Sequence, residues 1–495
     1  MKFKLHMLCA AMVFVAASVQ AAPTLHSVAV RSDAYQNKDA INNIVSKYIG
    51  HEINIKLLRK ILNEVNSYFH DLGYLSAQAF YPDQSSQDGS LIIEIAQPKL
   101  DHVNFNNLAN LNSYAMSVLF SDLKNYQNKY FSEKELESKL YKLNDLGLFK
   151  INGAYENSNQ SDSVNLNLTL DPVKKVNFAV FADNHGTKAA GKFRGGAQMN
   201  INNLTGSADA LSLFVARSQE SQDNFNLSYE IPVSSHPTIL GTSLCLSDYE
   251  LADEYKILGA QGKSLTYDIY VKEPLLRSNN YKLNFTGGFR YKKLSDEFKT
   301  FDVEFKKHSN TLYSGLNGVY VDKKLALEGN LNFNFGSLKN DDEYEMYEDG
   351  SFNVATFDGL LSYSFNSYVA FENRVYIQKG SDNLESSERF SPAGALMLSA
   401  YDSNVISADS GILNSSALSL KPFVNLDFKI SPHFDLAYAK SADDSGEKIY
   451  GTGIRFNFKK GGFFIDSSID APIGHKISDD TDSLKIFVRT GYHYA

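Results

Sequence analysis

Cysteine is scarce in this chain, which contains only two. Cys9 lies in the N-terminal leader described below, so Cys245 is the only cysteine expected in the mature protein. A single thiol cannot form an internal disulfide, although export removes the usual cytosolic reason for avoiding one. Other interactions must therefore hold the fold together.

Long hydrophobic runs are missing too. After residue 21, no segment reaches the roughly 18 apolar residues that a membrane-spanning helix needs. The formal net charge is −9, and an acidic balance disfavours nucleic acid as a partner. The chain is rich in Tyr and Phe, which suits a barrel in which only alternate strand residues meet lipid.

Catalytic and metal-binding motifs are absent as well. His51-Glu52 has no second histidine at helical spacing, and there is neither a Gly-x-Ser-x-Gly elbow nor a phosphate-binding loop. The acidic stretch 341–349 misses the spacing of a calcium loop and is expected to be a solvated external loop. We therefore expect no enzymatic activity, no cofactor and no metal site.

The N-terminus has the pattern of a secretory signal peptide. Lys2 and Lys4 precede an apolar stretch over residues 8–17, and Ala21 marks the expected cleavage site. This stretch is too short to be a membrane anchor. We therefore expect residues 1–21 to be removed and the mature protein to be exported.

The C-terminal segment 484–494 indicates which fold follows. Its side chains alternate between an apolar face and a mostly polar face, as they do in a β-strand. The first face carries Leu484, Ile486, Val488, Thr490, Tyr492 and Tyr494, and the second carries Lys485, Phe487, Arg489, Gly491 and His493. This pattern is typical of an outer-membrane β-barrel, with lipids outside and water or polar groups inside.

Residues 174–495 contain about sixteen such strands, an even number as bacterial single-chain barrels require. Among them we expect strands at 309–321 and 421–430. Short connections alternate with long ones, which we place outside the cell at 248–262, 293–308, 337–352, 380–411 and 431–448. A soluble β-sandwich or β-helix adhesin remains an alternative, but it would not predict this alternation.

Residues 24–172 contain a tandem repeat that precedes the barrel. In each copy we expect a strand, two helices and two strands, with the long helix ending at Asp71-Leu72-Gly73 or at Asp145-Leu146-Gly147. Ser132 and Glu135 form a capping box at the start of the second long helix. The order and size of these modules resemble polypeptide-transport-associated (POTRA) domains, although any small α+β module is an alternative.

Two stretches resemble the outer-membrane transporters of two-partner secretion. The first, 73–97, carries Gly73, Tyr74, Pro82, Gln84, Asp88 and Gly89. The second carries Asp183, Asn184, Gly186, Gly191, Lys192, Asn202, Asn203, Leu204, Gly206 and Asp209. The resemblance implies a signal peptide at 1–21, POTRA domains at 22–98 and 99–173, and a transmembrane β-barrel at 174–495.

The same resemblance implies two sites. One is an edge strand of the first POTRA domain that pairs with a client, here Leu75, Ala77, Gln78, Phe80 and Tyr81. The other is the loop 380–411, which folds into the lumen and is latched by an arginine to an aspartate of the wall. Aligned on Tyr401, that arginine is replaced by Ser399, and the wall aspartate would be Asp427. Either the latch is weaker in this chain or another cation serves.

The family also often carries a plug helix ahead of its first module. The mature sequence enters its first strand within a few residues of Ala22, so we expect no plug and a leaky resting pore. The function implied is export: an unfolded exoprotein is recognised in the periplasm and threaded through the barrel to the cell surface. Alternatives are a factor that inserts other barrels and a passive porin, which leaves the modules unexplained.

Overall fold

The computed structural model describes residues 23–32, 38–85, 88–160, 162–187, 189–220, 222–251, 256–257, 259–342, 349–403, 405–442, 445–474 and 483–494. The expected signal peptide lies outside these residues. The chain forms two units. One comprises Met1–His102, Asn128–Glu135 and Asn157–Asn165, and the other comprises Val103–Gln127, Leu136–Glu156 and Leu166–Ala495.

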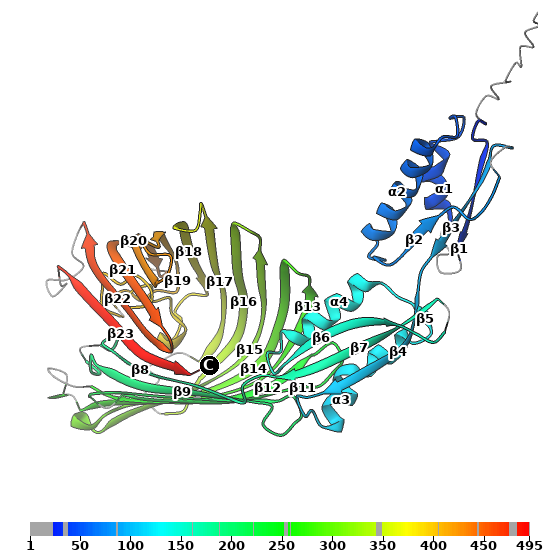
Figure 1. Cartoon of the computed structure of the whole chain (residues 1–495). Coiled ribbons are helices and arrows are strands. Elements are labelled where there is room, and N and C mark those ends of the chain that lie inside the picture. The colour runs from blue at the N-terminus through cyan, green and yellow to red at the C-terminus, as the bar shows by residue number, and fades with distance from the viewer. Residues whose placement is uncertain are drawn as a thin grey trace, which may run out of the picture. The chain divides into compact units, whose positions relative to one another are not determined.

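The first module is a three-stranded sheet with two helices (Figure 1). Its elements are β1 (Ser27–Ser32), α1 (Lys38–Ser46), α2 (Ile55–Asp71), β2 (Gln78–Phe80) and β3 (Ser90–Ala96), with sheet order β1-β3-β2. Helix α2 begins where the Asn54 side chain accepts a hydrogen bond from the Leu57 N–H (2.9 Å). It ends before Gly73, whose φ of +94° few other residues adopt. The predicted order of elements is confirmed.

The second module repeats this order and adds a short strand. Its elements are β4 (Lys99–Asn107), α3 (Ser113–Phe120), the 3-10 turn η1 (Ser121–Tyr126), β5 (Lys129–Tyr130), α4 (Glu133–Asn144), β6 (Phe149–Asn157) and β7 (Ser163–Pro172). The sheet order is β5-β4-β7-β6. As predicted, the Ser132 hydroxyl caps α4 by accepting a hydrogen bond from the Glu135 N–H (3.3 Å). The module boundaries at 98/99 and 173/174 stay predictions.

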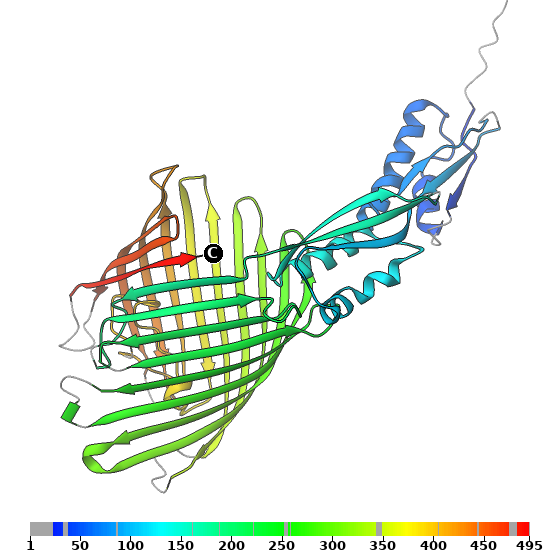
Figure 2. The same cartoon turned by 60° about the horizontal axis from the view of Figure 1, so that its bottom comes forward.

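Strands β8 to β23 form a closed barrel, which confirms the expected architecture. The first and last strands lie side by side (Figure 2), paired in antiparallel register from Arg489↔Asp183 to Tyr494↔Phe178. The sixteen strands are β8 (Val176–Asp183), β9 (Arg194–Asn202), β10 (Ala210–Ser218), β11 (Asp223–Pro232), β12 (Ile239–Glu250), β13 (Ala260–Arg277), β14 (Tyr281–Phe298), β15 (Val303–Val321), β16 (Leu325–Asn340), β17 (Gly350–Ser364), β18 (Val369–Gly380), β19 (Ser410–Leu420), β20 (Asp427–Lys440), β21 (Glu447–Lys460), β22 (Phe463–Ile473) and β23 (Lys485–Tyr494).

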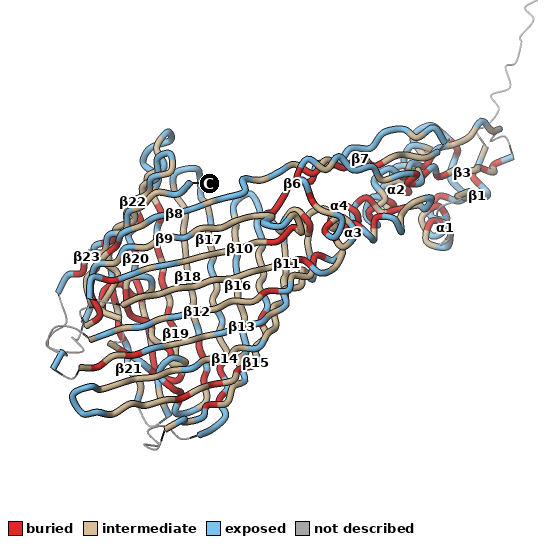
Figure 3. The backbone as a smooth tube through the Cα atoms, turned by 90° about the horizontal axis from the view of Figure 1, so that it is seen from below, coloured by how far each residue is buried: buried red, intermediate tan, exposed pale blue. Residues whose placement is uncertain are grey.

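The barrel wall is apolar outside and polar inside. In β23 the outward Ile486 and Val488 are exposed, whereas the inward Lys485 is buried. Figure 3 shows the same contrast more widely: buried residues concentrate in the modules, and the barrel strands are mostly intermediate or exposed. An exposed apolar outer face is what a barrel surrounded by lipid requires.

Several expected loops are strands instead. The segment 293–308 is a continuation of β14 and β15 around a short 3-10 turn, η3 (Lys299–Phe301), and the segment 431–448 is mostly β20. The strand expected at 421–430 is therefore misplaced, since 421–426 is a turn. In the continuations of β14 and β15 both strand faces are largely polar, so alternation no longer marks a strand. The segment 431–440 does alternate, with Phe434 exposed and Asp435 buried, and could have been recognised. Pro432, which lacks an N–H, lies where the β19–β20 pairing is interrupted.

Candidate functional site

Residues 381–409 connect β18 to β19 and lie on the inner wall of the barrel. They form one apolar cluster with inward-facing wall residues of β19, β20 and β21. The loop contributes Phe390, Ala393, Leu398, Ala400, Tyr401, Ile406 and Ala408, and the wall contributes Leu413, Ala437, Ala439 and Ile449. The connection therefore occupies part of the lumen.

Polar and aromatic contacts fix the loop's shape. Tyr401 is fully buried, and its hydroxyl donates a hydrogen bond to the Tyr450 carbonyl of β21 (3.2 Å). The backbones of Phe390 and Ala408 exchange hydrogen bonds of 2.7 and 3.0 Å, which close the loop on itself. The Phe390 ring stacks on Tyr376 of β18 at 5.8 Å. The loop is thus a folded element.

Three ion pairs join the loop to the neighbouring strands β14 and β15 and to the distant strand β23. The Lys307 ammonium of β15 lies 3.0 Å from Glu385, that of Lys292 in β14 lies 2.5 Å from Glu388, and that of Lys485 in β23 lies 2.7 Å from Asp402. The sequence reasoning missed these pairs. The alternation of each strand could have indicated them, because it places a lysine on the inner face of the wall, where a buried charge needs a partner of opposite sign.

The carboxyl of Glu385 is strongly acidic. Burial would raise its pKa, but hydrogen bonds from Ser386 and Ser387 and the nearby Lys307 charge together lower it to about 2. Glu385 is therefore ionised at every physiological pH and holds its ion pair with the wall.

The structure does not bring Ser399 and Asp427 together. Ser399 is buried beside β21, because its neighbours Leu398 and Ala400 contact Gly451, and its hydroxyl has no hydrogen-bond partner within the described part of the chain. Asp427 begins β20 at the opposite, short-turn end of the barrel. The assignment of Asp427 as the wall aspartate is therefore wrong.

Asp435 is the β20 carboxylate nearest to the loop tip. It pairs in register with Gly451, which the loop contacts, and it is fully buried. Its carboxylate lies 3.4 Å from the Arg455 guanidinium and 3.4 Å from the His433 imidazole. The cation beside this aspartate thus comes from the barrel wall and not from position 399 of the loop.

The expected client-binding strand lies at a sheet edge. β2 pairs only with β3 in the order β1-β3-β2, and the side chains of Leu75, Gln78 and Phe80 are exposed. Ala77 is buried, and Tyr81 donates its hydroxyl to the Leu58 carbonyl (3.2 Å), with burial raising the pKa of Tyr81 to about 12. The exposed side chains of Leu75, Gln78 and Phe80 are accessible to a partner. Ala77 and Tyr81 instead pack against the module and anchor the segment.

Part of this edge is already hydrogen-bonded. The Glu133 carboxylate accepts from the backbone N–H groups of Leu75 (2.9 Å) and Ser76 (3.0 Å). The Asn66 side chain accepts from the N–H of Ala79 (2.7 Å). These contacts protect the edge from unwanted strand pairing, which exposed edges otherwise invite.

The motif residues of the first stretch hold this edge in place. The Gln84 side chain donates to the Ile92 carbonyl (2.7 Å) and accepts from the Ile92 N–H (2.6 Å), so it continues the pairing of β3 beyond the short β2. Asp88 accepts from the Ser90 N–H (2.9 Å) at the turn into β3.

The motif residues of the second stretch join the second module to the barrel. The N–H of Asn112, the N-cap of α3, donates to the Gly206 carbonyl (2.9 Å), and its side chain donates to Ser207 (2.9 Å). The buried Asp209 accepts from the Thr205 N–H (3.0 Å) and shapes this turn. At another turn Arg277 forms two hydrogen bonds with Asp145 (2.7 and 3.1 Å). No motif in the sequence marked Arg277.

Neither a membrane-spanning helix nor a metal site is present in the part of the chain that the structure describes. None of the described helices is long and apolar enough to cross a membrane. The described residues contain no group of three His, Cys, Asp or Glu side chains that could hold a metal ion.

Comparison with protein families gives two matches. A family model described as haemolysin secretion/activation protein ShlB/FhaC/HecB matches residues 162–456. A model of the ShlB-type POTRA domain matches residues 24–97. Together they span the first module and most of the barrel.

Among curated proteins, the heme/hemopexin transporter protein HuxB of Haemophilus influenzae (strain 86-028NP) is 24% identical over 479 residues, covering 91% of this chain and 83% of that protein. The outer membrane transporter CdiB of Escherichia coli (strain 536 / UPEC) is 22% identical, covering 75% and 64%.

Among solved structures, CdiB from Escherichia coli matches with a TM-score of 0.79 and 18% identity, covering 98% of this chain and 93% of that one. BamA from Haemophilus ducreyi, lacking POTRA domains 1–3, matches with a TM-score of 0.57 and 14% identity, covering 95% and 100%. At such identities these likenesses describe the fold.

Proposed function

The chain belongs to the family of haemolysin secretion/activation proteins. From this membership and the geometry above, we propose that it exports one secreted partner protein across the Gram-negative outer membrane. The partner arrives unfolded in the periplasm, meets the two POTRA modules and passes through the barrel lumen. The loop 381–409 is the observation that carries this proposal. It is a folded element inside the barrel, and the two POTRA modules lie before the barrel in the sequence.

Recognition is proposed to begin at the edge of the first module. A client segment in extended conformation can add to β2 through main-chain hydrogen bonds, as peptides do at open sheet edges. Leu75 and Phe80 offer exposed apolar side chains, and Gln78 offers an exposed amide. Glu133 and Asn66 occupy nearby backbone donors, so a client must compete with them.

Passage is proposed to require movement of the loop. Near its start the loop pairs with Lys307 and Lys292, beside its buried tip Asp402 pairs with Lys485, and apolar packing runs along its length. A client that enters the lumen displaces the loop and breaks these contacts. No step requires nucleotide hydrolysis, and we propose that the protein is not an enzyme.

The runner-up is a factor that inserts other barrels into the membrane. The fold likeness to BamA favours it, but that match scores below the match to CdiB. Gene deletion separates the two functions. Export predicts that one exoprotein accumulates in the periplasm and disappears from the medium while other outer-membrane proteins stay at normal abundance. Depletion of several barrels with normal exoprotein release would establish the alternative.

A further inference from the structure

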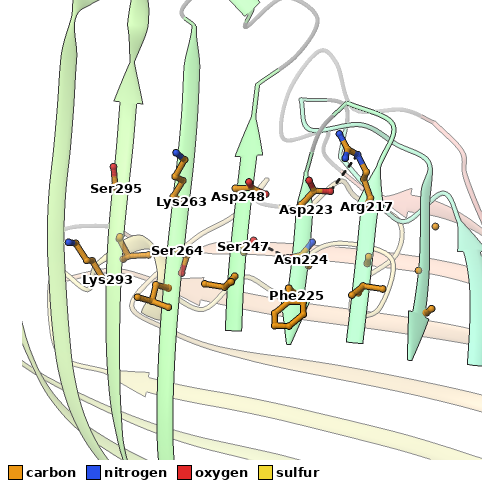
Figure 4. A pocket seen from close by; sticks show the side chains of 18 of the residues that line it. Arg217, Asp223, Asn224, Phe225, Ser247, Asp248, Lys263, Ser264, Lys293 and Ser295 are labelled. Atoms are coloured by element: carbon orange, nitrogen blue, oxygen red, sulfur yellow. Dashed lines mark hydrogen bonds and ion pairs between the residues drawn. The ribbon is translucent and has the colours of Figure 1, made fainter. Parts of the chain in front are cut away.

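The outer face of the barrel carries a groove of about 890 Å³ near the loop ends of strands β9 to β15 (Figure 4). Its floor is apolar and includes Val215, Phe225, Leu246 and Leu265. Val215 and Leu246 are exposed on the outer face of the wall. Cross-strand pairing places the half-buried Phe225 and Leu265 on the same face, because it joins Val215 to Phe225, Phe225 to Leu246, and Leu246 to Leu265. The groove therefore opens toward lipid rather than toward the lumen.

Charged side chains line the rim of this groove. Arg217 pairs with Asp223 (3.5 Å), and Lys306 pairs with Glu304 (2.6 Å). Figure 4 shows Arg217 and Asp223 on the neighbouring strands β10 and β11, and Lys263 on β13 beyond Asp248 of β12, all closer to the strand ends than Phe225. The rim thus lies on the loop side of the apolar floor.

Two rim lysines have no close counterion. Lys263 and Lys293 are exposed, and neither ammonium forms a hydrogen bond or a close ion pair within the described part of the chain. The Glu304 carboxylate, which pairs with Lys306, also lies within electrostatic range of Lys263. Asp248 faces Lys263 in the β12–β13 register but makes no ion pair with it. Since the rim carries four cations and three carboxylates, an anion can bind there without replacing an existing pair.

The lysines mark the edge of the apolar band. Below Lys263, the outward side chains of β13 are Leu265, Tyr267, Ile269 and Val271, and Tyr291 precedes Lys293 in β14. A lysine facing lipid costs little only near the membrane interface, where its ammonium reaches the headgroups. The loop ends face the cell exterior, because the modules lie in the periplasm, so this interface belongs to the outer leaflet.

We propose that the groove binds a phosphorylated lipid of the outer leaflet. Its phosphate lies between the ammonium groups of Lys263 and Lys293, and its acyl chains lie along Phe225, Leu246 and Leu265. Charge complementarity selects an anionic headgroup, and the apolar floor selects a lipid over a free anion. This site is independent of the client path, because it lies on the other side of the wall.

The test is native mass spectrometry of the detergent-solubilised full chain with diphosphoryl lipid A as the probe. We expect a one-to-one adduct with the wild type and at least fivefold weaker binding with the double variant Lys263→Gln/Lys293→Gln. The matched control is Lys323→Gln/Lys324→Gln, which removes the same charge from the exposed turn between β15 and β16 and should bind like the wild type. Heat-modifiable gel mobility confirms that each variant is a folded barrel.

Two further arms make the result specific. The variant Lys263→Arg/Lys293→Arg should retain binding, because the charge is kept. Inorganic phosphate in excess should not displace the lipid, and phosphatidylethanolamine should bind the wild type and the Gln variant equally. Equal losses in both lysine-to-glutamine variants, or displacement by phosphate alone, would overturn the proposal. Normal export by the Gln variant would leave the proposed function untouched.

Discussion

The ammonium of Lys307 lies 3.0 Å from the carboxylate of Glu385, and their side chains are only 2% and 4% exposed. Lys307 belongs to the wall strand β15, and Glu385 belongs to the loop inside the lumen. Removing one partner of a buried ion pair typically costs about 3–5 kcal/mol, although Asp296, 3.8 Å from the Lys307 ammonium, offsets part of that cost here. This pair is therefore a strong point of attachment between loop and wall.

The variant Glu385→Gln is expected to loosen the loop and raise the open probability of the channel in planar lipid bilayers by about tenfold or more. The charge-swapped variant Lys307→Glu/Glu385→Lys should restore a closed channel, because the pair forms again. Lys339→Gln removes an exposed charge from β16 and serves as the control. Wild-type conductance in Glu385→Gln would show that the pair does not hold the loop.

The same pair predicts how closure depends on pH. The folded-state pKa of Glu385 is about 2, below its ordinary value of 4.5, so the stabilisation is complete above about pH 4.5 and is lost as the pH falls toward 2. The shift corresponds to about 3 kcal/mol. Conductance should therefore be constant from pH 7 to pH 5 and rise below pH 4. In Glu385→Gln this acid-induced rise should be smaller, and an equal rise in both proteins would assign it to other groups.

Ser399 is expected to be dispensable. Its buried hydroxyl lacks a hydrogen-bond partner within the described residues, and burying such a group is unfavourable, so Ser399→Ala should leave stability unchanged or raise it by about 1 kcal/mol. Tyr401→Phe removes the hydrogen bond to Tyr450 and should cost about 1 kcal/mol. Thermal unfolding in detergent measures both. A large loss in Ser399→Ala alone would restore a latch role for this position.

Much of the fold could be predicted from the sequence, because strand alternation and helix ends depend on residues that are only a few positions apart. The alternation in 484–494 gave β23, and the spacing before Gly73 and Gly147 gave α2 and α4. The extensions of β14 and β15 were missed, since beyond the apolar band no lipid imposes an apolar face.

The latch could not be predicted from spacing. The loop tip meets β20 at the level of Asp435, eight residues beyond Asp427 in the sequence and about 26 Å along a strand. The point where the loop tip contacts the wall depends on how far a loop of nearly thirty residues (381–409) extends into the lumen. No local sequence pattern determines this depth. The basic partners of the loop, such as Lys485, come from strands distant in sequence for the same reason.

The edge of the first module provides the most direct test of client recognition. Leu75 and Phe80 are 52% and 41% exposed, so Leu75→Ala/Phe80→Ala should leave the fold intact. If the client pairs along β2, loss of these apolar contacts should reduce exoprotein release several-fold, because burying each side chain contributes about 1.5–3 kcal/mol. The measurement is the amount of exoprotein in the medium at equal transporter abundance.

The control for this experiment is Ile49→Ala, which truncates an equally exposed side chain (48%) of the same module away from β2. Release should be unchanged in this variant. Asn66→Ala adds a second test, because it frees the Ala79 N–H for a client and should not lower release beyond its effect on stability. Normal exoprotein release in Leu75→Ala/Phe80→Ala would show that the client binds at another edge. The next strands to mutate would be β1 and the exposed β6, because each is an edge strand of its sheet.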